Sequence, residues 1–107
     1  MPISAKRILG IDPGYDRVGV AVLEKRNGKD VVLFSDCLQT SAKLEFAERL
    51  FQVGTELEKI IKKWKPAALA VENLFFTANQ KTAMRVAETR GMIIYLGRKH
   101  GLEVKEF

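Results

Sequence analysis

The segment RILGIDPG, residues 7–14, decides the fold. Its first six residues form a short, mostly apolar run that predicts a β-strand over residues 7–12. Asp12, Pro13 and Gly14 then form a strong turn signal, because proline fixes φ and glycine adopts conformations that other residues avoid. Asp12 is therefore expected to be the last residue of the first strand.

Two more strand-like runs follow this segment. Residues 18–23 are rich in β-branched side chains, and residues 30–38 carry a second apolar run. Between them lies Asn27-Gly28, the pair most typical of a two-residue hairpin. The sequence therefore predicts that the chain opens with three antiparallel strands joined by tight turns.

From Ser41 the apolar residues recur every three or four positions as far as Trp64. This period predicts one amphipathic helix, which Lys65-Pro66 should end. Residues 67–71 are apolar without alternation, the pattern of a strand covered on both faces. This strand ends at Glu72.

A second helix and a last strand complete the pattern. Thr77-x-x-Gln80 has the form of a capping box, and the helix that it opens should run toward His100 and stop at Gly101. Residues 102–107 begin another strand. The order is β-β-β-α-β-α-β, and the strand at 67–71 should lie parallel to the first strand, beside it. We expect one α/β domain over residues 1–107, with a mixed sheet.

Composition narrows the class of protein. The chain has 107 residues, the size of one domain, and no apolar stretch of the ~20 residues that a membrane span needs. No signal peptide is evident, and the single cysteine, Cys37, excludes an internal disulfide. We expect a cytoplasmic protein in which Cys37 is a small core residue. The net charge of +5 favours polyanionic partners, although solubility alone also explains it.

Two carboxylates stand at comparable places in this pattern. Asp12 and Glu72 each end a predicted strand, and neighbouring parallel strands bring their carboxyl ends to the same edge of a sheet. Strands lie ~4.8 Å apart, a spacing at which two carboxylates share hard divalent cations such as Mg²⁺. The alternative is that Asp12 only begins a turn and that Glu72 is a surface acid.

The sequence resembles the RuvC family of Holliday junction resolvases. The resemblance rests on three segments, ILGIDPG at 8–14, AVENLFF at 70–76 and AETRG at 87–91, in an order and spacing that cover nearly the whole chain. It implies an RNase H-like fold, a homodimer, two Mg²⁺ ions per active site and paired nicking of four-way DNA junctions in recombination and repair. It also implies branch-migration motor proteins as partners.

The resemblance assigns roles to four residues. Asp12 and Glu72 match the first two of the family's four catalytic carboxylates. Phe75 matches the aromatic side chain that the family places against a base, and Asn79 falls in the same DNA-binding segment. The other two carboxylates lie on a later helix that this sequence does not reach, so its C-terminal part is expected to be missing.

Two other functions stay open at this stage. The chain could bind junctions without cutting them, since half of the expected ligands are absent. It could also be a fragment of an actin-like or sugar-kinase ATPase, which begins with a similar Asp-x-Gly hairpin. Such ATPases need a second glycine-rich phosphate hairpin and a second domain, and the sequence shows neither. Metal-dependent nicking of a junction and ATP binding would separate these functions.

Overall fold

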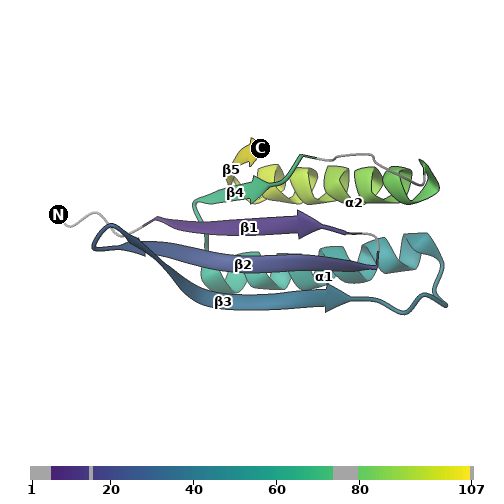
Figure 1. The fold of residues 1–107 in the computed structure, drawn as a ribbon, viewed down its shortest axis with the longest axis horizontal. Coiled ribbons are helices and arrows are strands. Elements are labelled where there is room, and N and C mark those ends of the chain that lie inside the picture. The colour runs from purple at the N-terminus through teal and green to yellow at the C-terminus, as the bar shows by residue number, and fades with distance from the viewer. Residues whose placement is uncertain (1–5, 15, 74–79, 107) are drawn as a thin grey trace.

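The computed structural model describes residues 6–14, 16–73 and 80–106. The elements follow the expected order, and their bounds are β1 (Arg7–Pro13), β2 (Arg17–Arg26), β3 (Lys29–Gln39), α1 (Phe46–Trp64), β4 (Ala68–Val71), α2 (Gln80–Lys99) and β5 (Glu103–Glu106). The five strands form one sheet in the order β3-β2-β1-β4-β5 (Figure 1).

The sheet is mixed, as expected. β1 pairs antiparallel with β2 and parallel with β4, and β4 pairs parallel with β5. In the parallel pair, Ile11 lies opposite Val71. This register fixes the relative positions of the two residues that follow, Asp12 and Glu72.

The two tight turns have the backbone that their sequences predict. Asn27 and Gly28 have φ angles of 51° and 75°, so both residues are left-handed, as the two-residue hairpin between β2 and β3 requires. In the β1–β2 turn, a Cβ atom on Gly14 would lie 2.3 Å from the carbonyl oxygen of Arg17. Only glycine fits there without a backbone shift.

The hydrophobic core lies between one face of the sheet and the two helices. Alternate residues of the strands, among them Leu9, Val20 and Leu69, are buried against α1 and α2. Figure 1 shows α1 behind β2 and β3, and α2 on the side of β4 and β5. In β4, Ala68, Leu69 and Val71 are buried and Ala70 is half-buried, so this strand is largely withdrawn from solvent, as its apolar sequence predicts. The run lacks alternation because positions 68 and 70 are alanines rather than polar residues.

Both helices end as expected, but α1 begins later than Ser41. The amide of Leu44 donates to the carbonyl of Ser41, which makes a separate turn before the helix. Lys65 is left-handed at the end of α1 and donates its amide to the Ile61 carbonyl, and Gly101, with φ 76°, follows α2. Thr77, expected to cap α2, lies outside the described residues.

Cys37 is exposed, so its expected place in the core is wrong. It lies opposite Gly19 of β2, whereas the next residue, Leu38, packs into the core with Val18. Alternation along β3 therefore turns the thiol away from the helices. In the part of the chain that the structure describes, neither helix has the length and apolarity that crossing a bilayer requires.

A charged cluster joins β1, β2 and α1 at the end of the sheet where β1 begins. Glu24 accepts from Arg7 at 3.3 Å and from Arg26 at 2.6 Å, and Arg7 also donates to the Trp64 carbonyl. The hydrogen bond from Arg26, together with the one from Arg7 and both positive charges, lowers the pKa of Glu24 below its ordinary value of 4.5 despite partial burial.

We expect Glu24→Gln to lower the melting temperature at neutral pH and to lose this effect in acid. A carboxylate with a lowered pKa stabilises the fold above its unfolded pKa, and this stabilisation disappears as the pH falls through the folded pKa. Thermal unfolding from about pH 7 to about pH 3 should show the wild-type and variant curves converging below about pH 4.5. Glu103→Gln is the matched control, because its partner Lys105 lies 3.8 Å away on the surface. A constant difference across this range would contradict the role of the Glu24 charge.

Candidate active site

Asp12 and Glu72 lie next to each other at the carboxyl ends of β1 and β4. Each directly follows the paired residues Ile11 and Val71, and the amide of Glu72 donates to the Ile11 carbonyl at 3.4 Å. Side chains alternate along a strand, so both carboxylates belong to the sheet face opposite the helices. Both residues are exposed. The expected juxtaposition of these two side chains is therefore present.

A shallow groove of about 360 Å³ runs along this open face beside the two carboxylates. Its floor is made of small residues on three adjacent strands, namely Gly10, Gly19, Ala21 and Ala70. A Cβ atom on Gly19 would lie 3.6 Å from the Cβ of Asp12, so this glycine leaves space beside the carboxylate. The floor thus gives a ligand access to both acids from solvent.

The turn after Asp12 is anchored from beneath by a buried arginine. Arg49 of α1 donates to the hydroxyl of Thr40 at 2.9 Å and to the carboxylate of Asp16 at 3.1 Å. The Arg49 side chain is 8% exposed. It therefore ties the β1–β2 turn and the segment after β3 to the helical layer.

The charges of the site favour a cation. Among the ion pairs between described residues, none includes Asp12 or Glu72. Two neighbouring carboxylates repel each other unless a positive charge lies between them. Their oxygen atoms fit Mg²⁺, which is bound in proteins through one or two carboxylates and keeps several water ligands.

A third acidic residue, Asp36 of β3, also lines the groove. Asp36 was not expected at the site, since nothing in its local sequence marks it. Nevertheless, the described residues contain no group of three His, Cys, Asp or Glu side chains arranged to hold a metal ion. Among the described residues, Asp12 and Glu72 are therefore the two neighbouring carboxylates open to a cation, and Asp36 does not join them in a group of three.

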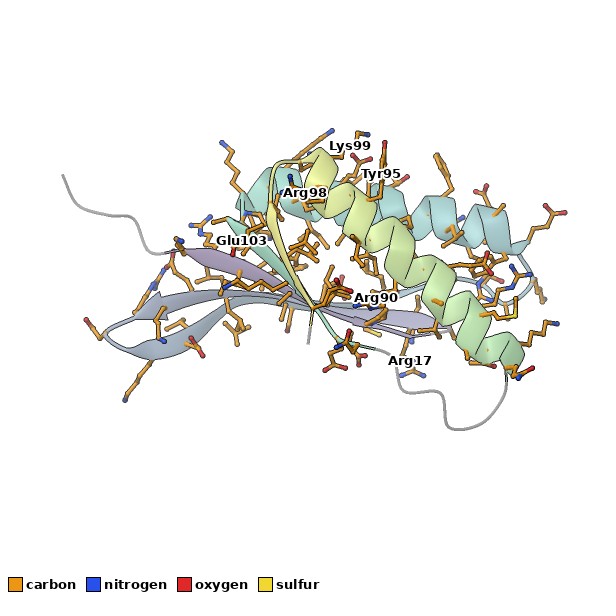
Figure 2. All side chains as sticks on the ribbon, turned by 90° about the horizontal axis from the view of Figure 1, so that it is seen from above. Arg17, Arg90, Tyr95, Arg98, Lys99 and Glu103 are labelled. Atoms are coloured by element: carbon orange, nitrogen blue, oxygen red, sulfur yellow. The ribbon has the colours of Figure 1, made fainter. Side chains whose placement is uncertain are left out.

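Arg90 of α2 is a second neighbour of the site that sequence reasoning missed. Its Nε donates to the Glu72 carbonyl at 2.9 Å, and its Nη2 donates to Asn73 Oδ1 at 3.1 Å and to the Glu106 carboxylate. Figure 2 shows Arg90 where α2 passes the ends of β4 and β5. Arg90 belongs to the AETRG segment at 87–91, one of the three segments on which the resemblance rests. This was the signal in the sequence that could have pointed to Arg90.

The two residues expected to contact DNA, Phe75 and Asn79, lie outside the described residues. The same is true of the neighbouring Phe76. In the sequence, their segment lies between Asn73, which follows Glu72, and Gln80, the first residue of α2.

A five-stranded mixed sheet with acidic side chains at two adjacent parallel strand ends is the arrangement of RNase H-like resolvases. The family model described as crossover junction endodeoxyribonuclease RuvC matches residues 8–107. The chain belongs to the RuvC family. A relative from Brachyspira hyodysenteriae, named crossover junction endodeoxyribonuclease RuvC, is 41% identical over 99 residues, which are 92% of this chain and 62% of the relative. The chain thus spans about three fifths of that relative's length.

Solved structures agree on the fold. The RuvC of T. thermophilus in complex with a Holliday junction substrate has a TM-score of 0.85 at 24% identity, over 95% of this chain and 64% of that one. The Aquifex aeolicus PPX-GPPA enzyme has a TM-score of 0.57 at 19% identity, over 96% of this chain and 36% of that one. At these identities the likeness concerns the fold alone, and it confirms the expected RNase H-like architecture.

Proposed function

We propose that this chain, together with the remaining length of its relatives, forms a Mg²⁺-dependent endonuclease that resolves Holliday junctions by paired nicks in recombination and repair. The observation that carries the proposal is the position of Asp12 and Glu72 on adjacent parallel strand ends, within a chain that belongs to the RuvC family. Nicking of a synthetic four-way junction in Mg²⁺, with a linear duplex of the same sequence as control, tests it.

Asp12 and Glu72 are the proposed catalytic carboxylates and metal ligands. They hold a divalent cation between them on the open face of the sheet, where the small residues of the groove leave room for a DNA strand. Two Mg²⁺ ions per active site supply activation of water and stabilisation of the leaving oxygen. The resemblance assigns the other two carboxylates to the length that this sequence does not include.

Branched DNA is the proposed substrate. The net charge of +5 provides a sequence-independent attraction to phosphates. Phe75 and Asn79 follow Glu72 within a few residues, so a base held by this segment would lie near the carboxylates. Stacking of one base on an aromatic ring contributes ~1–3 kcal/mol and helps to hold distorted DNA.

We expect Phe75→Ala to slow junction cleavage in the complete protein and to leave the salt dependence of junction binding unchanged, because stacking releases no counterions. Arg17→Gln is the contrasting variant. Arg17 is exposed at the start of β2, and loss of a phosphate contact there should reduce the salt slope by about one. The measurement is junction affinity across a salt series, alongside cleavage rates. A changed slope with unchanged cleavage in Phe75→Ala would mean that Phe75 is structural.

A homodimer is the proposed assembly, with α2 as the contact. The exposed side of α2 carries Met84, Ala87, Gly91 and Tyr95, which fall on one stripe at helical spacing. The opposite side, with Thr89, Ile93 and Leu96, is buried in this chain. Figure 2 shows Tyr95 pointing away from the sheet. A second copy that packs on this stripe would bury Met84 and Tyr95, which are 65% and 64% exposed.

Tyr95→Asp is expected to shift the dimer toward monomer, because it places a charge in an apolar contact. Sedimentation velocity over a concentration series measures the shift. Phe51→Asp on α1 is the matched control, since Phe51 is equally exposed, at 67%, but lies outside the stripe. A monomeric parent chain, or equal weakening by both substitutions, would rule out the α2 contact.

The remaining parts of the proposal follow from the substrate. A nuclease of recombination intermediates acts on chromosomal DNA, so we propose a cytoplasmic location. Family resemblance adds branch-migration motor proteins as partners, and co-sedimentation on junction DNA would test that association.

A further inference from the structure

Arg90 joins three groups at the point where β4 and β5 end. Its guanidinium donates to the Glu72 carbonyl, to the side-chain oxygen of Asn73 and to the Glu106 carboxylate. The Arg90 side chain is 15% exposed, whereas that of Glu106 is 52% exposed. A largely buried arginine with three acceptors is a fixed part of the structure rather than a mobile surface charge.

The hydrogen bond from Arg90 gives the Glu72 carbonyl a partner at a position where the β4–β5 ladder has already ended. The last paired residues of β4 and β5 are Val71 and Glu106, so Glu72 lies one residue beyond that ladder. On its other side, the Glu72 amide reaches the Ile11 carbonyl at 3.4 Å, a long hydrogen bond. Arg90 holds the same residue through its carbonyl at 2.9 Å. The backbone that carries the Glu72 carboxylate is therefore fixed from α2 as well as from β1.

The planar fork of arginine suits this task. One guanidinium offers five N–H groups in fixed directions, so it can bond to a carbonyl, an amide oxygen and a carboxylate together. Lysine keeps the charge but loses this geometry. Glu106 of β5 accepts from the same guanidinium. The position of Glu72 therefore depends on contacts from β1, α2 and β5.

We propose that Arg90 is a positioning residue that sets the Glu72 carboxylate for a divalent cation shared with Asp12. This inference rests on the proposed function of the site and adds a residue to which the resemblance assigns no role. Arg90 acts through the Glu72 backbone and does not itself touch the metal. Replacing a residue that orients a metal ligand typically lowers metal affinity or activity about 10–100-fold.

The test measures metal binding in this chain without any DNA. Titration with Mn²⁺, followed by paramagnetic broadening of backbone amide NMR signals near Asp12 and Glu72, gives an affinity for the site. Arg90→Lys should weaken it about tenfold, and Glu106→Gln should weaken it less, because that variant leaves the fork in place. Arg98→Lys is the matched control. Arg98 lies two turns further along α2 and donates to the Leu102 carbonyl at 3.1 Å, away from the carboxylates.

The outcomes separate the two proposals. Amide spectra establish that each variant is folded, and Glu106→Gln carries the test if Arg90→Lys does not fold. Parent-like Mn²⁺ affinity in the folded arginine and glutamate variants would overturn the positioning role while leaving the metal site intact. Broadening that Asp12→Asn fails to reduce would instead overturn the metal site and the role of Arg90 with it.

Discussion

Asp12→Asn or Glu72→Gln, introduced into the complete protein, is expected to lower Mg²⁺-dependent junction cleavage by more than about 100-fold. Replacing a residue that only orients a metal ligand typically lowers metal affinity or activity about 10–100-fold. Asp12 and Glu72 are the proposed ligands themselves, so a larger loss of activity is expected. An amide keeps the shape of the side chain but binds Mg²⁺ poorly. Junction binding should persist and could tighten, since each substitution removes a negative charge near the phosphates.

Single-turnover cleavage and gel-shift binding, measured on the same junction, separate the two effects. Asp36→Asn is the matched control, because Asp36 lines the same groove from β3 but does not form a group of three with the carboxylate pair. It should cleave at nearly the wild-type rate. Wild-type cleavage by either Asp12→Asn or Glu72→Gln would refute the two-carboxylate site.

The second large effect concerns the 107-residue chain by itself, which is expected to bind a divalent cation weakly and to show no junction turnover. Two-metal hydrolysis needs further ligands, and the described residues bring only two carboxylates together. We also expect marginal stability or self-association, because β5 forms an edge of the sheet and the large apolar side chains of Met84 and Tyr95 are exposed.

A junction-nicking assay with the purified chain tests this expectation. The Asp12→Asn chain, prepared in the same way, controls for contaminating host nuclease, since a contaminant would cut equally in both preparations. Joining the chain to the remaining length of a relative should restore nicking. Symmetric, Mg²⁺-dependent nicking by the unextended chain and not by its Asp12→Asn variant would contradict the expectation.

Local signals explain why much of the fold could be predicted from the sequence. Strand β1 ends where Pro13 and Gly14 force a turn, and the Asn27-Gly28 pair fixes the β2–β3 hairpin. Because crossover connections favour one arrangement, these signals also placed Glu72 beside Asp12. The site pair thus followed from two strand ends and one topological rule.

Contacts between distant residues explain what could not be predicted. The interaction of Arg90 with the Glu72 carbonyl spans 18 positions, and no local pattern reports it. The exposure of Cys37 depends on the direction in which β3 alternates, which its neighbour Leu38 determines by packing into the core.

The strand order has a consequence for how the site tolerates change. β1 and β4 each have a neighbour on both sides, whereas β3 and β5 form the edges of the sheet. Fraying of a sheet starts at its edges, where backbone hydrogen bonds are easiest to open. The β2–β3 hairpin lies at the end of the sheet where β1 begins, whereas Asp12 and Glu72 lie at the opposite end. Insertions or deletions in this hairpin would therefore leave the two carboxylates in place. The fold thereby separates the part of the molecule that can diverge in length from the part whose geometry must be conserved.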